Sequence, residues 1–212
     1  MRHKLVEALG NLREGDVLAE IKELKKGNAQ LVEIIQLLQE GMSMVGSRFE
    51  ANEYYLSELI LSSKIFKQAI DLLGERFEEQ SLCKYGTFVI GTVFGDIHDI
   101  GKNIVANILR CNGFKVIDLG VNVPTKKFVA AAEEYKPDIL GISCLLTTGF
   151  ENMKATVKAI EDAGLRSVLK VLIGGGPVNQ TTCRYVGADG FSTNAQEAVE
   201  LSKKIMESKR NG

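Results

Sequence analysis

The chain has 212 residues, 45% of them apolar and 25% charged, with 21 glycines and 3 prolines. This composition excludes a disordered or collagen-like chain, and the length allows one or two domains. With 26 basic and 27 acidic residues the net charge is −1, so we expect neither nucleic acid nor a membrane surface as a partner. Only His3 and His98 could supply imidazole, which excludes a metal centre built from several internal histidines.

Location and redox state follow from two absences in the sequence. No stretch approaches 18 consecutive apolar residues, and residues 1–10 are polar and periodic, so we predict a cytoplasmic protein. The cysteines form no C-x-x-C pair, and we expect reduced thiols rather than a zinc or redox site. They are Cys83, Cys111, Cys144 and Cys183.

The first 86 residues are predicted to form a helical domain. All three prolines and 14 of the 21 glycines come after residue 86. Apolar side chains recur three and four residues apart, with Asp16 as the expected N-cap of the second helix. The expected helices cover residues 5–12, 17–24, 31–45 and 56–73. Four amphipathic helices with short joints predict a small antiparallel four-helix bundle over residues 1–86.

Residues 87–212 follow a different pattern, in which short apolar runs alternate with helical segments. The expected strands cover residues 87–93, 115–119, 138–143, 170–173 and 190–192. The expected helices cover residues 104–113, 125–136, 151–163 and 195–209. We predict a doubly wound, flavodoxin-like α/β domain with a five-stranded parallel sheet, whose ligand lies beyond the carboxyl ends of the strands.

The loop after the first expected strand, GDIHDIG over residues 95–101, carries the most informative residues. Asp96 stands two residues before His98 and could fix the tautomer of its imidazole, leaving the other nitrogen for a metal or a proton-transfer partner. An ordinary surface histidine is the alternative. Gly101 would let a planar group or a phosphate approach the start of the next helix.

Two further loops reach the same edge of the sheet. Residues 143–149, SCLLTTG, could donate hydrogen bonds to a ligand, and Gly174, Gly175 and Gly176 offer a wall without side chains, or a plain turn.

These loops lack the residues that several other functions require. A receiver domain needs an aspartate where Ser143 ends the third strand, and a dinucleotide-binding loop needs G-x-G-x-x-G, which the glycines after the first strand do not form. A P-loop is absent. A serine hydrolase could combine Ser143 with His98, but the sequence has no G-x-S-x-G motif.

Three motifs in order resemble a known family. They are Asp96-x-His98-x-x-Gly101, then Ser143-x-Leu145 after 41 residues, then Gly174-Gly175 after another 28. Together they resemble the cobalamin-binding domain in which a histidine replaces the nucleotide base as lower ligand to cobalt.

The helical half adds to the resemblance. Residues 41–49, GMSMVGSRF, and 55–59, YLSEL, are similar to the cap domain of the methyl-carrying branch of that family. The whole chain resembles the corrinoid protein of anaerobic methyltransferase systems, itself similar to the B12-binding fragment of methionine synthase. The resemblance implies a cap domain over residues 1–86 and a Rossmann-like cobalamin-binding domain over residues 87–212.

The resemblance also implies roles for single residues. His98 would be the lower axial ligand of cobalt, with Asp96 hydrogen-bonded to its far nitrogen. Phe49 and Leu56 would cover the upper face of the corrin, although core packing would also explain them. The other cofactor-binding residues would be Gly95, Ile97, Asp99, Gly101, Ser143, Leu145, Thr147, Gly174, Gly175 and Ala195.

The sequence departs from the methionine-synthase-like pattern at two positions. Gly149 stands where that pattern has a hydroxyl that extends the Asp-His relay, so either Thr147 or Thr148 substitutes or the relay stops at Asp96 and water. Ser57 replaces a proline in the cap.

The resemblance implies a non-catalytic subunit that binds methylcobalamin or a related corrinoid, base-off and His-on, and carries a methyl group between two proteins. One would be a substrate-specific methyltransferase and the other a methylcorrinoid:acceptor methyltransferase acting on a folate or a thiol. A reductive activase would be a further partner. Two alternatives remain, namely the small subunit of an adenosylcobalamin mutase, which would not need the helical cap, and a cobalamin-dependent sensor, which normally carries an effector domain.

Overall fold

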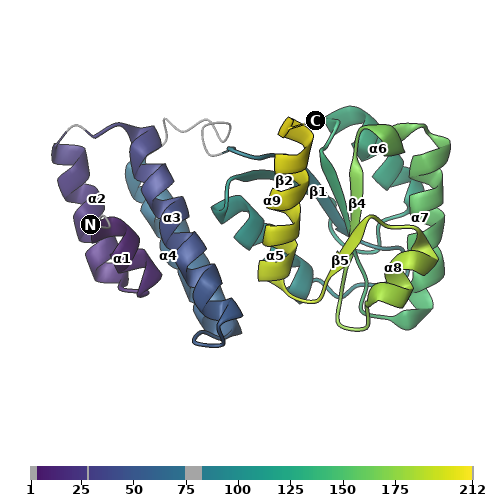
Figure 1. Cartoon of the computed structure of the whole chain (residues 1–212), viewed down its shortest axis with the longest axis horizontal. Helices are drawn as coiled ribbons and strands as arrows, with labels where there is room; N and C mark the ends of the chain where they lie inside the picture. The colour runs from purple at the N-terminus through teal and green to yellow at the C-terminus, as the bar shows by residue number, and fades with distance from the viewer. Residues whose placement is uncertain (1–3, 28, 75–82, 212) are drawn as a thin grey trace. The chain divides into compact units, whose positions relative to one another are not determined.

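The computed structural model describes residues 4–27, 29–74 and 83–211. The chain divides into two compact units. The first is Met1–Lys84 with Arg110–Gly113, and the second is Tyr85–Leu109 with Phe114–Gly212. Each unit is described below by itself (Figure 1).

Four helices form the first unit, as the sequence predicted. They pack around fully buried leucine and isoleucine side chains, among them Leu9, Ile34 and Leu38. At Gly41 a Cβ atom would lie 2.9 Å from Cβ of Leu9, so only glycine allows the first and third helices to approach this closely. The helices are α1 (Lys4–Gly10), α2 (Glu14–Lys26), α3 (Leu31–Glu50) and α4 (Leu56–Leu73).

The prediction that Asp16 caps the second helix is wrong. The helix α2 begins at Glu14, three residues earlier than expected, and its N-cap is Arg13. Asp16 lies in the first turn, where its carboxylate pairs with the Arg13 guanidinium at 3.0 Å. A carboxylate in the first turn still interacts favourably with the positive end of the helix dipole.

The second unit is built on a five-stranded parallel sheet with the strand order β2-β1-β3-β4-β5. This is the flavodoxin-like order, and it confirms the predicted fold class. The strands are β1 (Gly86–Thr92), β2 (Phe114–Asp118), β3 (Ile139–Ser143), β4 (Lys170–Gly174) and β5 (Gly190–Ser192).

Helices cover both faces of the sheet. In Figure 1, α5 (Ile100–Cys111) and α9 (Ala195–Asn211) lie on one face, and α6 (Thr125–Tyr135), α7 (Phe150–Asp162) and α8 (Gln180–Val186) lie on the other. The core beneath α6, α7 and α8 contains Phe128 and Met153, both fully buried. Burial on both faces explains why the three inner strands, β1, β3 and β4, contain continuous runs of buried residues rather than alternating ones.

The strand order fixes where a ligand site can form. The chain runs from β1 outward to β2 and then returns to β3 on the other side of β1, so the loops after β1 and β3 diverge at their carboxyl ends. Thr92 and Ser143 are register partners at those ends. No helix within the described ranges is both long and apolar enough to cross a membrane.

Candidate functional site

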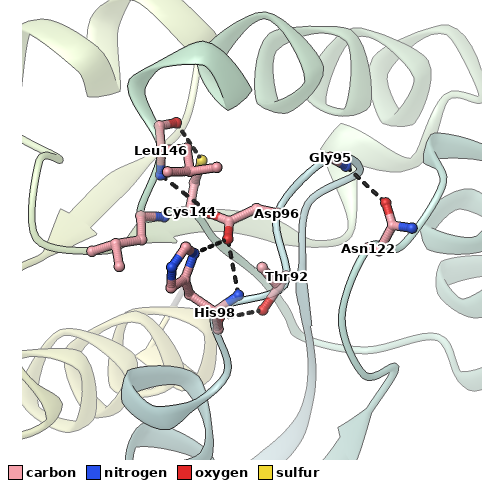
Figure 2. A network of polar contacts seen from close by, with 8 residues as sticks. Thr92, Gly95, Asp96, His98, Asn122, Cys144 and Leu146 are labelled. Carbon is pink, nitrogen blue, oxygen red and sulfur yellow. Dashed lines mark hydrogen bonds and ion pairs between the residues drawn. The ribbon is translucent and has the colours of Figure 1, made fainter.

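Asp96 and His98 meet in the loop after β1. The Asp96 side chain is fully buried, whereas the His98 side chain is 48% exposed, and the two are joined by a contact of 2.6 Å between Nδ1 of His98 and Oδ1 of Asp96 (Figure 2). The carboxylate accepts, so this nitrogen carries the proton and Nε2 is the ring nitrogen available to a metal. The sequence predicted this pairing from the two-residue spacing.

Backbone N–H groups hold the Asp96 carboxylate from two loops. Oδ1 accepts from N–H of His98 at 2.9 Å, and Oδ2 accepts from N–H of Leu145 at 2.6 Å and of Leu146 at 3.2 Å. Leu145 and Leu146 follow β3, so Asp96 ties together the two loops that diverge at the switch point (Figure 2).

These contacts decide the ionisation of Asp96. Burial by itself raises the pKa of the Asp96 carboxyl, but hydrogen bonds from N–H of His98, from N–H of Leu145, from the His98 ring and from N–H of Leu146 outweigh it. They hold the pKa of Asp96 well below its usual range, so a carboxylate stands behind the imidazole at neutral pH.

The loop after β2 supports the same site. The Asn122 side chain accepts from N–H of Gly95 at 2.8 Å, and its backbone N–H donates to the Asp96 carbonyl at 2.9 Å (Figure 2). Gly95 has φ of +85°, a conformation that favours glycine. Thr92 Oγ1 donates to the His98 carbonyl at 3.2 Å, so the backbone is fixed on both sides of Asp96.

The donor set fits a metal that brings most of its own ligands. Within the described part of the chain, no three His, Cys, Asp or Glu side chains gather to hold an ion, so His98 would act as a single protein ligand. Large apolar side chains stand exposed on the surrounding loops and at the start of α5, as a flat organic ring would require. They are Phe94, Ile97, Ile100, Leu145 and Leu146, with exposed fractions from 41% to 77%. A metal held in a macrocycle fits both observations.

The glycines at the end of β4 differ from one another. Gly175 has φ of +138°, and a Cβ there would lie 1.8 Å from the Cys144 carbonyl oxygen, so the fold itself requires glycine. A Cβ on Gly174 would lie 3.5 Å from the Ser192 carbonyl oxygen, which is ordinary contact. At Gly101, in the first turn of α5, a Cβ would have no atom within 4 Å.

The remaining predicted residues of this unit lie at the same edge of the sheet. Ser143 is the last residue of β3 and is half-buried, Thr147 is exposed in the following loop, and Asp99 is exposed just before α5. Ala195 is the buried first residue of α9, the next element after β5.

The absence of a hydroxyl side chain at position 149 has a physical explanation. The Cys144 thiol, which donates to the Leu146 carbonyl at 3.0 Å, occupies the space beside Gly149, where a Cβ would lie 2.5 Å from Sγ. In the described part of the chain no hydrogen bond joins Thr147 or Thr148 to Asp96, and both threonines are exposed. In this structure Asp96 thus connects His98 to the N–H groups of Leu145 and Leu146, and not to the hydroxyl of either threonine.

The two predicted cap residues lie in the helical unit. Phe49 is half-buried near the end of α3, and Leu56, the first residue of α4, is 49% exposed. Core packing alone does not account for the exposed leucine. His3 lies outside the described residues.

Sequence reasoning missed the hydrogen bonds from Leu145 and Leu146. Backbone donors carry no signal in residue identity, and the leucine side chains point to apolar contact instead. The strand order was the one available indication, because it brings the loops after β1 and β3 together.

Comparison with known proteins identifies the cofactor class. Residues 86–200 match a family model described as a B12 binding domain, and residues 1–74 match a second model with the same description. The chain is 37% identical over 205 residues to the dimethylamine corrinoid protein of Methanosarcina barkeri, covering 96% of each chain.

Solved structures agree with these matches. A cobalamin-binding protein from Desulfitobacterium hafniense DCB-2 is 38% identical, with a TM-score of 0.80 over 95% of this chain and 96% of that one. The methanol:cobalamin methyltransferase complex MtaBC from Methanosarcina barkeri matches at 26% identity and a TM-score of 0.81, over 96% of this chain and 78% of that one. The chain with the Asp96–His98 pair thus belongs to the B12-binding corrinoid proteins of methyltransferase systems.

Proposed function

We propose that this chain is a methyl carrier that binds cobalamin or a related corrinoid with His98 as the lower axial ligand. The observation that carries the proposal is the 2.6 Å contact between Asp96 and Nδ1 of His98, which leaves Nε2 for cobalt. When bound, the corrinoid supplies the metal that accepts and releases the methyl group.

The protein's part is to hold and orient the ligand. Asp96 keeps the proton on Nδ1 and fixes the orientation of the imidazole, as a carboxylate behind a metal-bound histidine does. Because Asp96 is itself fixed by three backbone N–H groups, the ring orientation is set before the cofactor arrives.

The loops around His98 provide the rest of the cofactor site. Gly95, Ile97, Asp99 and Gly101 belong to the segment on either side of the ligand, where the corrin ring would lie. The nucleotide tail would lie along residues of the other loops, with Gly174 leaving room for it. These are Ser143, Leu145, Thr147, Gly174, Gly175 and Ala195. Phe49 and Leu56 would cover the opposite face of the corrin.

The partners follow from the chemistry of a carrier. A substrate-specific methyltransferase would load the methyl group, and a methylcorrinoid:acceptor methyltransferase would pass it to a folate or a thiol. A reductive activase would restore the reduced metal. Relatives are named for dimethylamine and methanol, so these two methyl donors are the first to assay. These names favour the methyl carrier over a mutase subunit or a sensor.

Replacing His98 with alanine tests the ligand directly. The wild-type protein, labelled with ¹⁵N-histidine and loaded with the cobalt(II) form of cobalamin, should show an electron paramagnetic resonance spectrum with doublet nitrogen splitting, because ¹⁵N has spin one-half. His98→Ala should lose this splitting and show a base-off visible spectrum. His3→Ala, which removes the other histidine, is the matched control and should keep both. A His98→Ala protein with wild-type spectra would refute the assignment.

A further inference from the structure

Lys102 is a buried lysine for which the proposed carrier function gives no role. Its side chain is 2% exposed, in the first turn of α5 and four residues after His98. The ammonium group pairs with the carboxylate of Asp118, the last residue of β2, and donates to Oδ1 of Asn103 at 2.7 Å. Burying the ammonium costs free energy because the group loses its hydration. We therefore asked which part of the structure this ion pair holds in place.

From Asp118, hydrogen bonds lead to the backbone of His98. Oδ1 of Asp118 accepts from N–H of Gly120 at 2.9 Å. The Gly120 carbonyl accepts from N–H of Thr92 at 3.0 Å, and Thr92 Oγ1 donates to the His98 carbonyl at 3.2 Å. Thr92 is fully buried, so the end of this path next to His98 is anchored in the protein interior.

A second path reaches the residue after His98. Asn103, which accepts from the Lys102 ammonium, donates from Nδ2 to the Asp99 carboxylate at 3.0 Å. Its backbone N–H donates to the Asp99 carbonyl at 2.7 Å. Lys102 is therefore connected to the chain at His98 and at Asp99, and both paths start from its ammonium group.

We propose that Lys102 and Asp118 form a positioning pair that fixes the backbone at His98 and at Asp99 and holds the His98 imidazole in place for cobalt. Lys102 is buried, so it acts through Asp118, Thr92 and Asn103 and not by contact with the corrinoid. This proposal rests on the role of His98 proposed above. It explains why a costly buried charge stands beside a loop whose geometry decides cofactor binding.

Lys102→Met tests the pair by removing the charge and keeping an apolar stem. We expect cobalamin affinity to fall about 10–100-fold, the usual effect of losing a group that orients a metal ligand, with a larger His-off fraction in the visible spectrum. Arg166→Met is the matched control. Arg166 and Asp189 form a second ion pair in the same unit, with side chains 24% and 22% exposed, but Asp189 accepts from N–H of Val171 at the opposite edge of the sheet.

Hydrogen exchange in the cofactor-free protein gives a readout that does not depend on cobalt. In Lys102→Met the N–H of His98 should exchange about tenfold faster, while the core strands change no more than in Arg166→Met. This exchange measurement stays informative even if the His98→Ala test refutes His98 as the cobalt ligand. The ligand proposal and the positioning proposal can therefore be refuted independently.

The double variant Lys102→Met/Asp118→Leu separates positioning from stability. It has no charge left at this pair and should recover much of the lost stability, yet it lacks the acceptor for Gly120 N–H and should keep the weak affinity and the fast His98 exchange. If Lys102→Met does not fold, the affinity and exchange measurements are made on the double variant instead. Wild-type affinity together with wild-type exchange at His98, in whichever of the two variants folds, would overturn the proposal.

Discussion

Two adjacent glycines at the end of β4 serve different requirements. Gly175 adopts a positive φ directly against the Cys144 carbonyl, so its need for glycine comes from the fold. Gly174 has room for a methyl group in the protein alone, so any need for glycine there comes from the cofactor. A sequence motif cannot distinguish a glycine that the backbone conformation requires from one that leaves space for a cofactor, because the residue is the same in both cases.

Substituting each glycine by alanine separates them. Gly175→Ala should destabilise the cofactor-free protein by about 3 kcal/mol, because the methyl group meets backbone in a strained conformation. Gly174→Ala should change stability by less than about 1 kcal/mol and yet weaken cobalamin binding about tenfold. Urea unfolding and spectroscopic titration measure the two effects. Equal losses of stability would contradict this division.

At the residue scale the sequence predicted side-chain pairs better than backbone contacts. Asp96 and His98 were found because their types and spacing limit what they can do. The support from Leu145 and Leu146 comes from a loop far along the chain, and the ion pair between Lys102 and Asp118 joins α5 to β2. Both become visible only in three dimensions.

At the scale of elements, the helix α8 is the one that periodicity missed. It spans Gln180–Val186, only seven residues, and follows a glycine- and proline-containing loop that indicated a turn. Its N-cap is Asn179, whose side chain accepts from N–H of Thr181 at 2.9 Å and of Thr182 at 3.0 Å. Seven residues are too few for a periodic signal, whereas the cap was readable.

The Asn179 cap gives a prediction for this helix. Asn179→Ala should cost about 1 kcal/mol in the free energy of unfolding, because two N–H groups lose their acceptor. Asn179→Asp keeps an oxygen at that position and should stay within about 0.5 kcal/mol of the wild-type value. Urea unfolding of the three proteins checks this. An aspartate variant as unstable as the alanine variant would argue against the cap.

At the scale of the whole molecule, the sequence predicted both architectures. The helical unit was predictable because its apolar positions recur at helical spacing, and the sheet because five apolar runs alternate with helices. The positions of the helix ends were less predictable, as Asp16 illustrates, because capping depends on local turns that the apolar pattern does not record.

The four cysteines are distributed over the molecule and differ in reactivity. None is in a disulfide, three are buried, and Cys83 is half-buried. Burial raises the pKa of the Cys111 thiol to about 12 and that of the Cys144 thiol to about 11. Since the thiolate is the reactive form, both should remain unreactive near neutral pH.

Alkylation of the cofactor-free protein checks this order. At pH 8 iodoacetamide should modify Cys83 first, and Cys111, Cys144 and Cys183 should react only as fast as the protein unfolds. Mass spectrometry of the digested protein identifies the modified residue, and Cys83→Ser should abolish the fast reaction. Rapid modification of Cys144 in the folded protein would contradict the burial described here.

The hydrogen bonds that hold Asp96 have a consequence for how this site tolerates mutation. Three of its donors are peptide N–H groups, at His98, Leu145 and Leu146, and every amino acid except proline supplies such a group. The side chains at 145 and 146 can therefore drift in evolution, adapting to a different corrinoid or partner, while the carboxylate behind the ligand stays in place. Because the support for Asp96 does not depend on side-chain identity, this edge of the sheet tolerates mutation at the positions where we propose that it contacts the cofactor.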